Sequence, residues 1–221
     1  MKKLELENIK ADLRGYLRNN NALISPEFRK VVADVARFVD VVIRDGFKVA
    51  LTQSLANVNV QPDSSFIEVA EALVEHHIRF LRQVDREIAH KSLLEAYTHI
   101  ADPRFVFEPT RKTEFVNALR RSGPKKFAAL IISLHLYNVI CGQIQNDLHR
   151  RIPDPKTLQL YLLKVEALCR DIIADIVKVQ PAECDEEWAL AVIRSVETQL
   201  LRPQVPPTKS SDLSIPTGYK K

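Results

Sequence analysis

Residues 127–146, FAALIISLHLYNVICGQIQN, decide the fold of this chain. The stretch contains no Asp, Glu, Lys or Arg, although 27% of the 221 residues are charged. At helical spacing its large apolar side chains point in every direction, because Leu130 and Leu134 share one side while Leu136 and Ile140 share the opposite side. A helix that is apolar on all sides is either a membrane span or the central helix of a globular core.

The polar residues of the stretch favour the buried helix. His135, Asn138 and three amide side chains near its end lower its hydropathy below that of a span, which needs about 20 predominantly apolar residues. Basic residues flank both ends, so no one-sided charge would orient the helix in a membrane. We therefore predict an all-α, single-domain bundle of six to seven helices over residues 1–202, around a central buried helix at 127–146.

The segments on both sides of the central helix also have helical periodicity. They predict helices over residues 2–19, 26–56, 65–101, 111–121, 155–179 and 184–201. The pattern over 65–101 is long for one helix, and we expect a bend near His90–Ser92, where its apolar stripe weakens. Residues 203–221 are rich in Pro, Ser and Lys and have no periodicity, which predicts a disordered tail.

Several helix starts carry recognisable capping signals. Ser25 precedes Pro26, and Asp154 precedes Pro155, which are combinations of an N-cap with a proline at the first helical position. Ser65 and a Glu three residues later fit the capping box. The short linker before Pro155 predicts that the helices on either side of it pack antiparallel.

The helix predicted at 155–179 has the most regular apolar seam in the chain. Its inward positions follow each other at spacings of four and three residues, which is typical of helix–helix packing: Leu158, Leu162, Val165, Cys169, Ile172 and Ile176. We expect Leu162, Cys169 and Ile172 to lie in the core.

The composition disfavours several enzyme classes. The chain has only five glycines, and it contains no G-x-G-x-x-G, Walker A, H-E-x-x-H or C-x-x-C motif. No catalytic residue, metal ligand or cofactor can be nominated from spacing. The three cysteines and the absence of a signal-peptide pattern in residues 1–10 predict a reducing, cytoplasmic setting.

The histidines have structural as well as functional interpretations. Glu87 and His90 form one Glu-x-x-His step, but a di-iron bundle needs two such steps, so we expect a solvated helix face there. Of the adjacent pair at 76 and 77, His77 is expected to turn towards the core. His135 and Asn138 lie on the helix that is apolar all round, so they either connect neighbouring helices or line a pocket.

The strongest charge feature is a basic cluster between residues 111 and 126. It has six basic residues and one acidic residue, Glu114, in a chain whose net charge is +4. We nominate the basic residues as a candidate surface for an anion or a partner: Arg111, Lys112, Arg120, Arg121, Lys125 and Lys126. Arg150 and Arg151 are expected at the same end of the bundle. The alternative is that Asp185, Glu186 and Glu187 neutralise the cluster internally.

These patterns predict a non-enzymatic helical protein that interacts with other proteins and has a regulatory or assembly role. The alternatives are a nucleic-acid-binding module that uses the basic end around 111–126, and a ligand-binding or enzymatic bundle with a pocket near His135. A protein partner is expected. The wide apolar arcs on several helices also predict a homo-oligomer.

Overall fold

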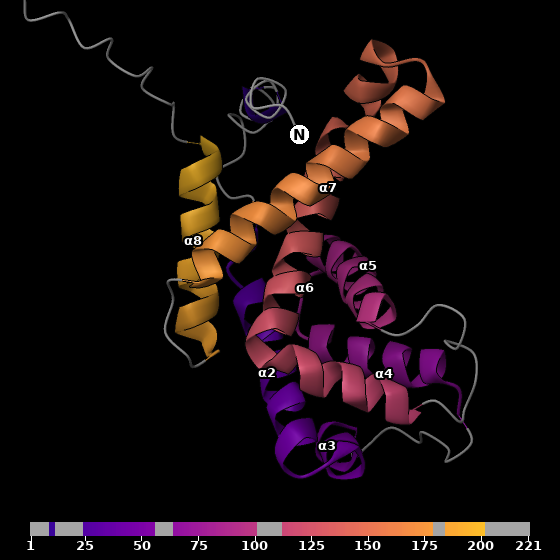
Figure 1. Cartoon of the computed structure of the whole chain (residues 1–221), viewed down its shortest axis with the longest axis vertical. Coiled ribbons are helices and arrows are strands. Elements are labelled where there is room, and N and C mark those ends of the chain that lie inside the picture. Colours follow the sequence, from indigo (N-terminus) through magenta and orange to yellow (C-terminus); the bar gives the residue numbers. More distant parts are fainter. Residues whose placement is uncertain (1–8, 12–23, 56–63, 101–111, 179–183, 202–221) are drawn as a thin grey trace, which may run out of the picture.

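The computed structural model describes residues 9–11, 24–55, 64–100, 112–178 and 184–201, and these residues form an all-α bundle (Figure 1). The prediction of the fold class is therefore confirmed. The helices are α2 (Phe28–Arg44), α3 (Phe47–Ser54), α4 (Phe66–Ile78), α5 (Gln83–Ile100), α6 (Lys112–Arg151), α7 (Pro155–Lys178) and α8 (Glu186–Leu201). Residues 9–11 are also helical, whereas the rest of the helix predicted at 2–19 and the tail predicted at 203–221 lie outside the described residues.

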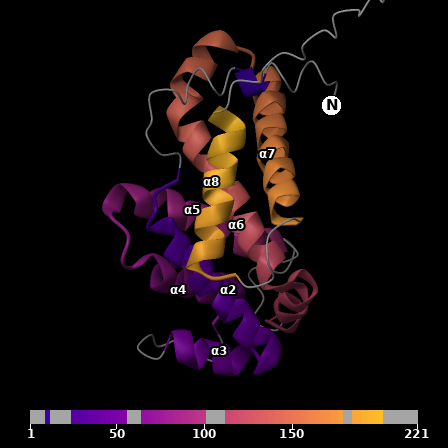
Figure 2. The same cartoon turned by 90° about the vertical axis from the view of Figure 1, so that its left-hand side faces the viewer.

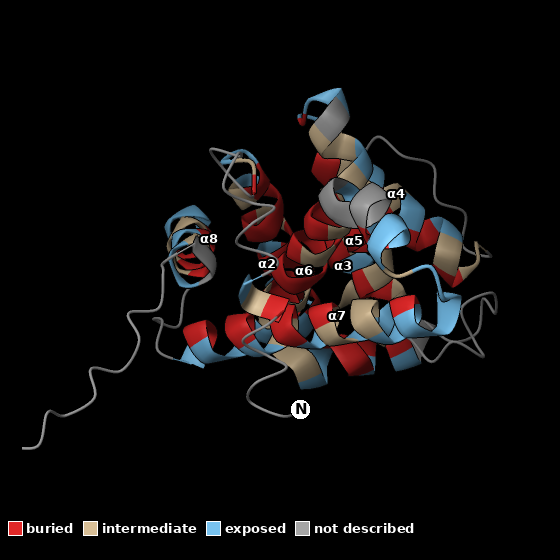
Figure 3. Cartoon of the chain, turned by 90° about the horizontal axis from the view of Figure 1, so that it is seen from above, coloured by how far each residue is buried: buried red, intermediate tan, exposed pale blue. Residues whose placement is uncertain are grey.

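Helix α6 is the centre of the bundle. It packs against α2, α5 and α7, while α8 covers α2 and α7 from outside (Figures 1 and 2). Its apolar stretch contributes Phe127, Ile131, Ile132, Leu136 and Ile140 to the core, each at most 1% exposed. In Figure 3, the buried residues concentrate on α2 and α6. Among the described helices, none combines the length and apolar character that crossing a bilayer requires.

A kink at Gly123 divides α6 into the short helix and the central helix that the sequence predicts. Gly123 has φ 71° and ψ 165°, a backbone conformation that residues with a Cβ rarely adopt, and Pro124 follows it. Before the kink, Phe115 is buried against Phe47, Phe66 and Tyr97. The short first part of α6 thereby connects α3, α4 and α5.

Two predicted helices are interrupted in the structure. The one expected over 26–56 divides into α2 and α3 at Gly46, whose φ of 93° and ψ of 160° suit glycine alone. The pattern over 65–101 divides at residues 79–82, between α4 and α5, and not near His90–Ser92. At the predicted bend α5 is unbroken, and the Ser92 hydroxyl donates to the carbonyl of Ile88 over 2.6 Å within the helix.

The capping signals are confirmed at two of the three starts. Ser65 and Glu68 form both bonds of a capping box at α4. At α7, the Asp154 carboxylate accepts from the backbone N–H of Thr157 over 2.9 Å. The predicted cap at Ser25 is wrong, because its hydroxyl donates to the Glu27 carboxylate over 2.6 Å and α2 begins later, at Phe28.

Candidate interaction groove

Helices α6 and α7 pack antiparallel, and three hollows follow one another along their shared side. The first, of about 520 Å³, lies beside the kink of α6 and the end of α7. Its apolar floor is formed by Ala129, Leu130, Ile173, Ala174 and Val177. Its charged lining residues are all basic: Lys125, Lys126, Arg170 and Lys178.

The second hollow, of about 540 Å³, lies further along α6 and has a mixed charge. Helix α5 contributes Lys91 and Glu95, whose nitrogen and oxygen are 3.9 Å apart. Helix α7 contributes Glu166 and Arg170, which pair over 2.5 Å. Tyr137 of α6 lies between these two walls. Each wall therefore presents its own pair of opposite charges.

The third hollow, of about 310 Å³, lies at the far end of the central helix. Its lining includes Cys141 and Leu148 of α6 and Leu158 and Leu162 of α7. Burial raises the pKa of the Cys141 thiol, so this cysteine remains protonated at neutral pH.

Neighbouring hollows share lining residues. Arg170 lines the first and second, and Lys91 and Tyr137 line the second and third. The α6 residues that line them recur at three or four positions, as on one helix face: Lys126, Leu130, Ser133, Tyr137 and Cys141. We refer to this feature as the α6–α7 groove, and it spans about 22 Å from Lys126 to Cys141 at the rise of a helix.

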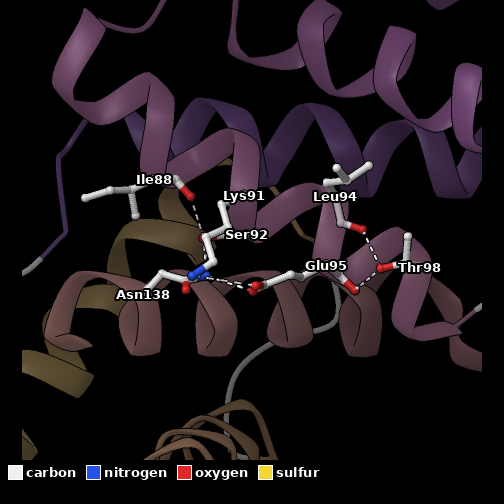
Figure 4. A network of polar contacts seen from close by, with 7 residues as sticks. All are labelled: Ile88, Lys91, Ser92, Leu94, Glu95, Thr98 and Asn138. Carbon is white, nitrogen blue, oxygen red and sulfur yellow. Dashed lines mark hydrogen bonds and ion pairs between the residues drawn. The ribbon is translucent and has the colours of Figure 1, made fainter. Parts of the chain in front are cut away.

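A buried amide holds α5 against α6 beside the groove (Figure 4). The Nδ2 atom of Asn138 donates to the Ser92 hydroxyl over 3.1 Å and to the Glu95 carboxylate over 2.9 Å. Asn138 is 5% exposed. Because Glu95 also lines the second hollow, this contact sets the position of one groove wall.

His135 lies in the core and not in the groove. Its ring stacks on Phe28 of α2 with the centroids 3.6 Å apart, and burial lowers its pKa to about 3. Neither His135 nor Asn138 lines any of the three hollows of the groove. The structure thus places both polar residues at contacts between helices.

His77 lies in the core too. It is 2% exposed beside Phe38, which confirms the expected inward turn of His77, and its neighbour His76 is half-buried. Burial, with smaller contributions from His76 and Arg79, lowers the pKa of His77 to about 3.

The structure separates the basic residues nominated from the sequence. Arg111 lies outside the described residues, and the side chain of Lys112 is not described. Arg120 and Arg121 are exposed before the kink. Lys125 and Lys126 line the first hollow, where Arg170 and Lys178 of α7 join them.

The expectation that Arg150 and Arg151 return to the same end is wrong. The helix is continuous from Pro124 to Arg151, so Arg150 lies about 38 Å from Lys125 along its axis. An antiparallel neighbour returns the chain to the basic end, but that neighbour is α7. The cations that arrive there are therefore Arg170 and Lys178.

The acidic start of α8 lies beside the kink of α6. Cys184 and Asp185 line a hollow together with Pro124, and the Asp185 carboxylate accepts from the backbone N–H of Trp188 over 2.7 Å. Glu186 pairs with Arg29 of α2 at 3.6 Å. Lys125 is close enough to the Cys184 thiol to act on it electrostatically, so the start of α8 lies near the α6 part of the cluster.

The described residues include no candidate metal site. No group of three His, Cys, Asp or Glu side chains there could hold an ion. His90 instead lies 3.5 Å from the carboxylate of Glu75, which also pairs with Arg86.

Comparison of the chain with protein-family models, curated proteins and solved structures gives no match in any of the three.

Proposed function

We propose that this protein is a non-enzymatic helical interaction protein that binds an acidic amphipathic helix of a partner protein in the α6–α7 groove. One observation carries the proposal. The first hollow has an apolar floor, and its charged lining residues, two from each helix, are all basic: Lys125, Lys126, Arg170 and Lys178.

The floor is suited to apolar side chains presented at helical spacing. Ala129 and Ala174 are small, so a partner helix can approach closely, while Leu130 and Val177 offer larger apolar contacts. Binding of an amphipathic helix in an apolar groove is a common mode of peptide recognition. The first hollow extends from Lys125 to Ser133 on α6, about 12 Å at the rise of a helix, which accommodates about two turns of a partner helix.

The cations contribute by acting together. A single exposed ion pair stabilises by about 0.2–1 kcal/mol and is screened by salt. Arg170 pairs with Glu166 over 2.5 Å, and Lys178 pairs with Asp175 over 2.9 Å. Lys178 and Asp175 are both more than 70% exposed, so Lys178 stays accessible to a second carboxylate. A cluster of like charges steers an acidic partner and selects against a basic one.

An acidic helix fits the first hollow better than a nucleic acid does. The phosphate backbone has no apolar face to cover the floor, and none of the residues that line this hollow is aromatic and could stack on a base. Apolar burial and charge complementarity therefore favour a peptide that supplies both.

The proposal can be tested by fluorescence anisotropy with a labelled synthetic peptide, designed as a helix with leucines on one face and glutamates on the other. The groove variant carries Lys126→Glu and Lys178→Glu. The matched control, Arg120→Glu with Arg121→Glu, makes the same change in net charge on exposed residues before the kink. We expect the groove variant to lose about tenfold or more in affinity, corresponding to about 1.4 kcal/mol, and the control to lose much less.

Two further probes test whether binding needs the apolar face of the peptide and whether a nucleic acid binds instead. A peptide of the same composition with scrambled order keeps the charge but loses the apolar face, and it should bind weakly. A duplex DNA oligonucleotide tests the alternative. Equal loss in both variants, equal binding of the scrambled peptide, or tighter binding of DNA with a steep salt dependence would each contradict the proposal.

A further inference from the structure

Arg170 connects the first two hollows of the groove, because it lines both of them. Its guanidinium donates from an Nη atom to the Glu166 carboxylate over 2.5 Å. Its Nε atom is buried and has no hydrogen-bond partner among the described residues. A buried donor without an acceptor is unfavourable, and a guanidinium has enough donors for two carboxylates. An acid of the partner helix in the first hollow can therefore pair with Arg170 and compete with Glu166 for its charge.

The charges of the second hollow balance only while the charge of Arg170 belongs to Glu166. The basic residues that line this hollow are Lys91 and Arg170, and the acidic ones are Glu95 and Glu166, with His99 counted as neutral. The ammonium of Lys91 lies 3.9 Å from the Glu95 carboxylate, so these two residues compensate each other. Once a partner acid shares Arg170, Glu166 no longer has a full positive charge of its own. The second hollow is then locally negative.

This negative charge lies around Tyr137, far from the lysines of the first hollow. Burial raises the pKa of the Tyr137 hydroxyl, and Cys141, Glu166 and Glu95 add to this effect, so both carboxylates lie near the ring. The lysines of the first hollow are at least eleven residues from Tyr137 on α6 or from Glu166 on α7, about 16 Å or more along the helix axes. Salt screens exposed charges at that separation, because the Debye length is about 8 Å at physiological ionic strength.

We propose that the partner helix carries a lysine or an arginine one turn from the acid that pairs with Arg170, and that this cation lies beside Glu166 and Tyr137 in the second hollow. The inference rests on the proposed function, because it specifies the partner of the same groove. Arg170 and Glu166 are four residues apart on α7, about 6 Å, which matches an acidic and a basic residue four positions apart on the partner. A helix with acids at both positions would set a like charge against Glu166, so the second hollow selects against it.

The test compares three labelled peptides by fluorescence anisotropy at low salt. The all-acid peptide has the leucine and glutamate faces described above. The ordered peptide keeps one glutamate beside the leucine face and has lysine four positions later. The displaced peptide has the same composition, but its lysine lies in the middle of the face that points away from the leucines. We expect the parent protein to bind the ordered peptide about threefold or more tighter than the displaced peptide.

A pair of variants identifies the residue that recognises the lysine. Glu166→Gln should abolish the difference between the ordered and displaced peptides, and it should strengthen binding of the all-acid peptide because Arg170 is then available to its acids. The matched control is Glu187→Gln, which removes the same charge from an exposed position of α8 that lines none of the three hollows. The control should bind all three peptides as the parent does.

Equal affinity of the parent for the ordered and displaced peptides would overturn the inference, as would a difference that persists in Glu166→Gln. The comparison on the parent needs no variant, so it decides the inference even if Glu166→Gln does not fold. Binding of the all-acid peptide that still depends on Lys126 and Lys178 would then leave the proposed function standing. Absence of binding by all three peptides would refute both.

Discussion

At the scale of single residues, the core contains two imidazoles that folding keeps neutral. His77 and His135 lie on α4 and α6, are at most 3% exposed, and contact Phe38 and Phe28. A charged imidazole at either position would lie in an apolar environment, and burial accordingly lowers the pKa of both to about 3. The two histidines therefore favour folding only while they are unprotonated.

This burial predicts a steep loss of stability in mild acid. Below the unfolded-state pKa of about 6.5, the unfolded chain binds protons at both histidines while the folded chain does not. The free energy of unfolding therefore decreases as the pH is lowered, until the folded-state pKa of about 3 is reached. For each histidine we expect a fall of about 2 kcal/mol between pH 7 and pH 5, with a slope that approaches about 1.4 kcal/mol per pH unit at the acidic end, measured by urea denaturation at several pH values in this range. His135→Phe and His77→Leu should each remove about half of the slope, and the exposed His99→Gln serves as control. Stability that is constant over this range would refute the assignment.

The amide of Asn138 predicts a different response. Asn138→Asp would replace a donor by a carboxylate at 2.9 Å from the acceptor oxygen of Glu95, so two like charges would meet in a partly buried site. The loss of the donor alone should destabilise by about 1–3 kcal/mol, as Asn138→Ala would show. The aspartate variant should lose more at neutral pH and regain part of the loss in acid, where one carboxyl is protonated. Equal stability of both variants at all pH values would mean that Glu95 is not the partner.

At the scale of the elements, glycine occurs both where a helix is interrupted and inside a regular helix. Gly46 and Gly123 have φ of 93° and 71°, and Gly142 lies within the regular part of α6. An added Cβ would have no atom within 4 Å at any of them, so backbone conformation alone decides the effect of a substitution. The break at Gly46 and the kink at Gly123 thus depend on residues without a side chain, unlike the turn between α4 and α5.

We therefore expect Gly123→Ala and Gly46→Ala to destabilise by about 1–2 kcal/mol or more, because alanine adopts these conformations poorly. Gly142→Ala should instead stabilise by about 0.5–1 kcal/mol through better helix propensity. Thermal and chemical denaturation of the three variants would measure the difference. A stabilising effect at Gly123 would show that α6 is not kinked there.

The seam of α7 gives the clearest packing prediction. Ile172 and Cys169 are buried, whereas Leu162 is only partly buried and lines the third hollow. Ile172→Ala should therefore cost about 2–5 kcal/mol in the free energy of unfolding. Leu162→Ala should cost clearly less, because that side chain has less apolar surface to lose. A larger loss at Leu162 than at Ile172 would contradict this arrangement.

The helices themselves could be predicted from local signals. The capping groups of α4 and α7 and the seam of α7 act over a few residues, so the sequence displays them directly. The sequence predicts the turn between α4 and α5 about ten residues too late, because residues 79–82 contain neither Gly nor Pro and the apolar pattern continues through them. Leu81 in this turn is buried and continues the apolar pattern, so the pattern alone does not mark the break.

At the scale of the whole molecule, the groove depends on the antiparallel packing of α6 and α7, which brings residues distant in the chain together. Lys125 and Lys126 were nominated from their sequence neighbours, but Arg170 and Lys178 were not, because they are isolated cations within an otherwise apolar pattern. The only sequence feature that connects them is that both lie on one flank of the α7 seam. The sequence thus predicts a basic end, and the packing divides it into Arg120 and Arg121 before the kink and the lysines that line the groove.

The most direct test of the central claim is a map of where the acidic amphipathic peptide binds, obtained from amide chemical-shift changes of the labelled full chain during titration. The account predicts that changes concentrate at residues 125–133 of α6 and 170–178 of α7, and that they disappear in the variant with Lys126→Glu and Lys178→Glu. Changes centred on Arg120 and Arg121 without any along α7, or a titration that leaves both helices unaffected, would contradict it.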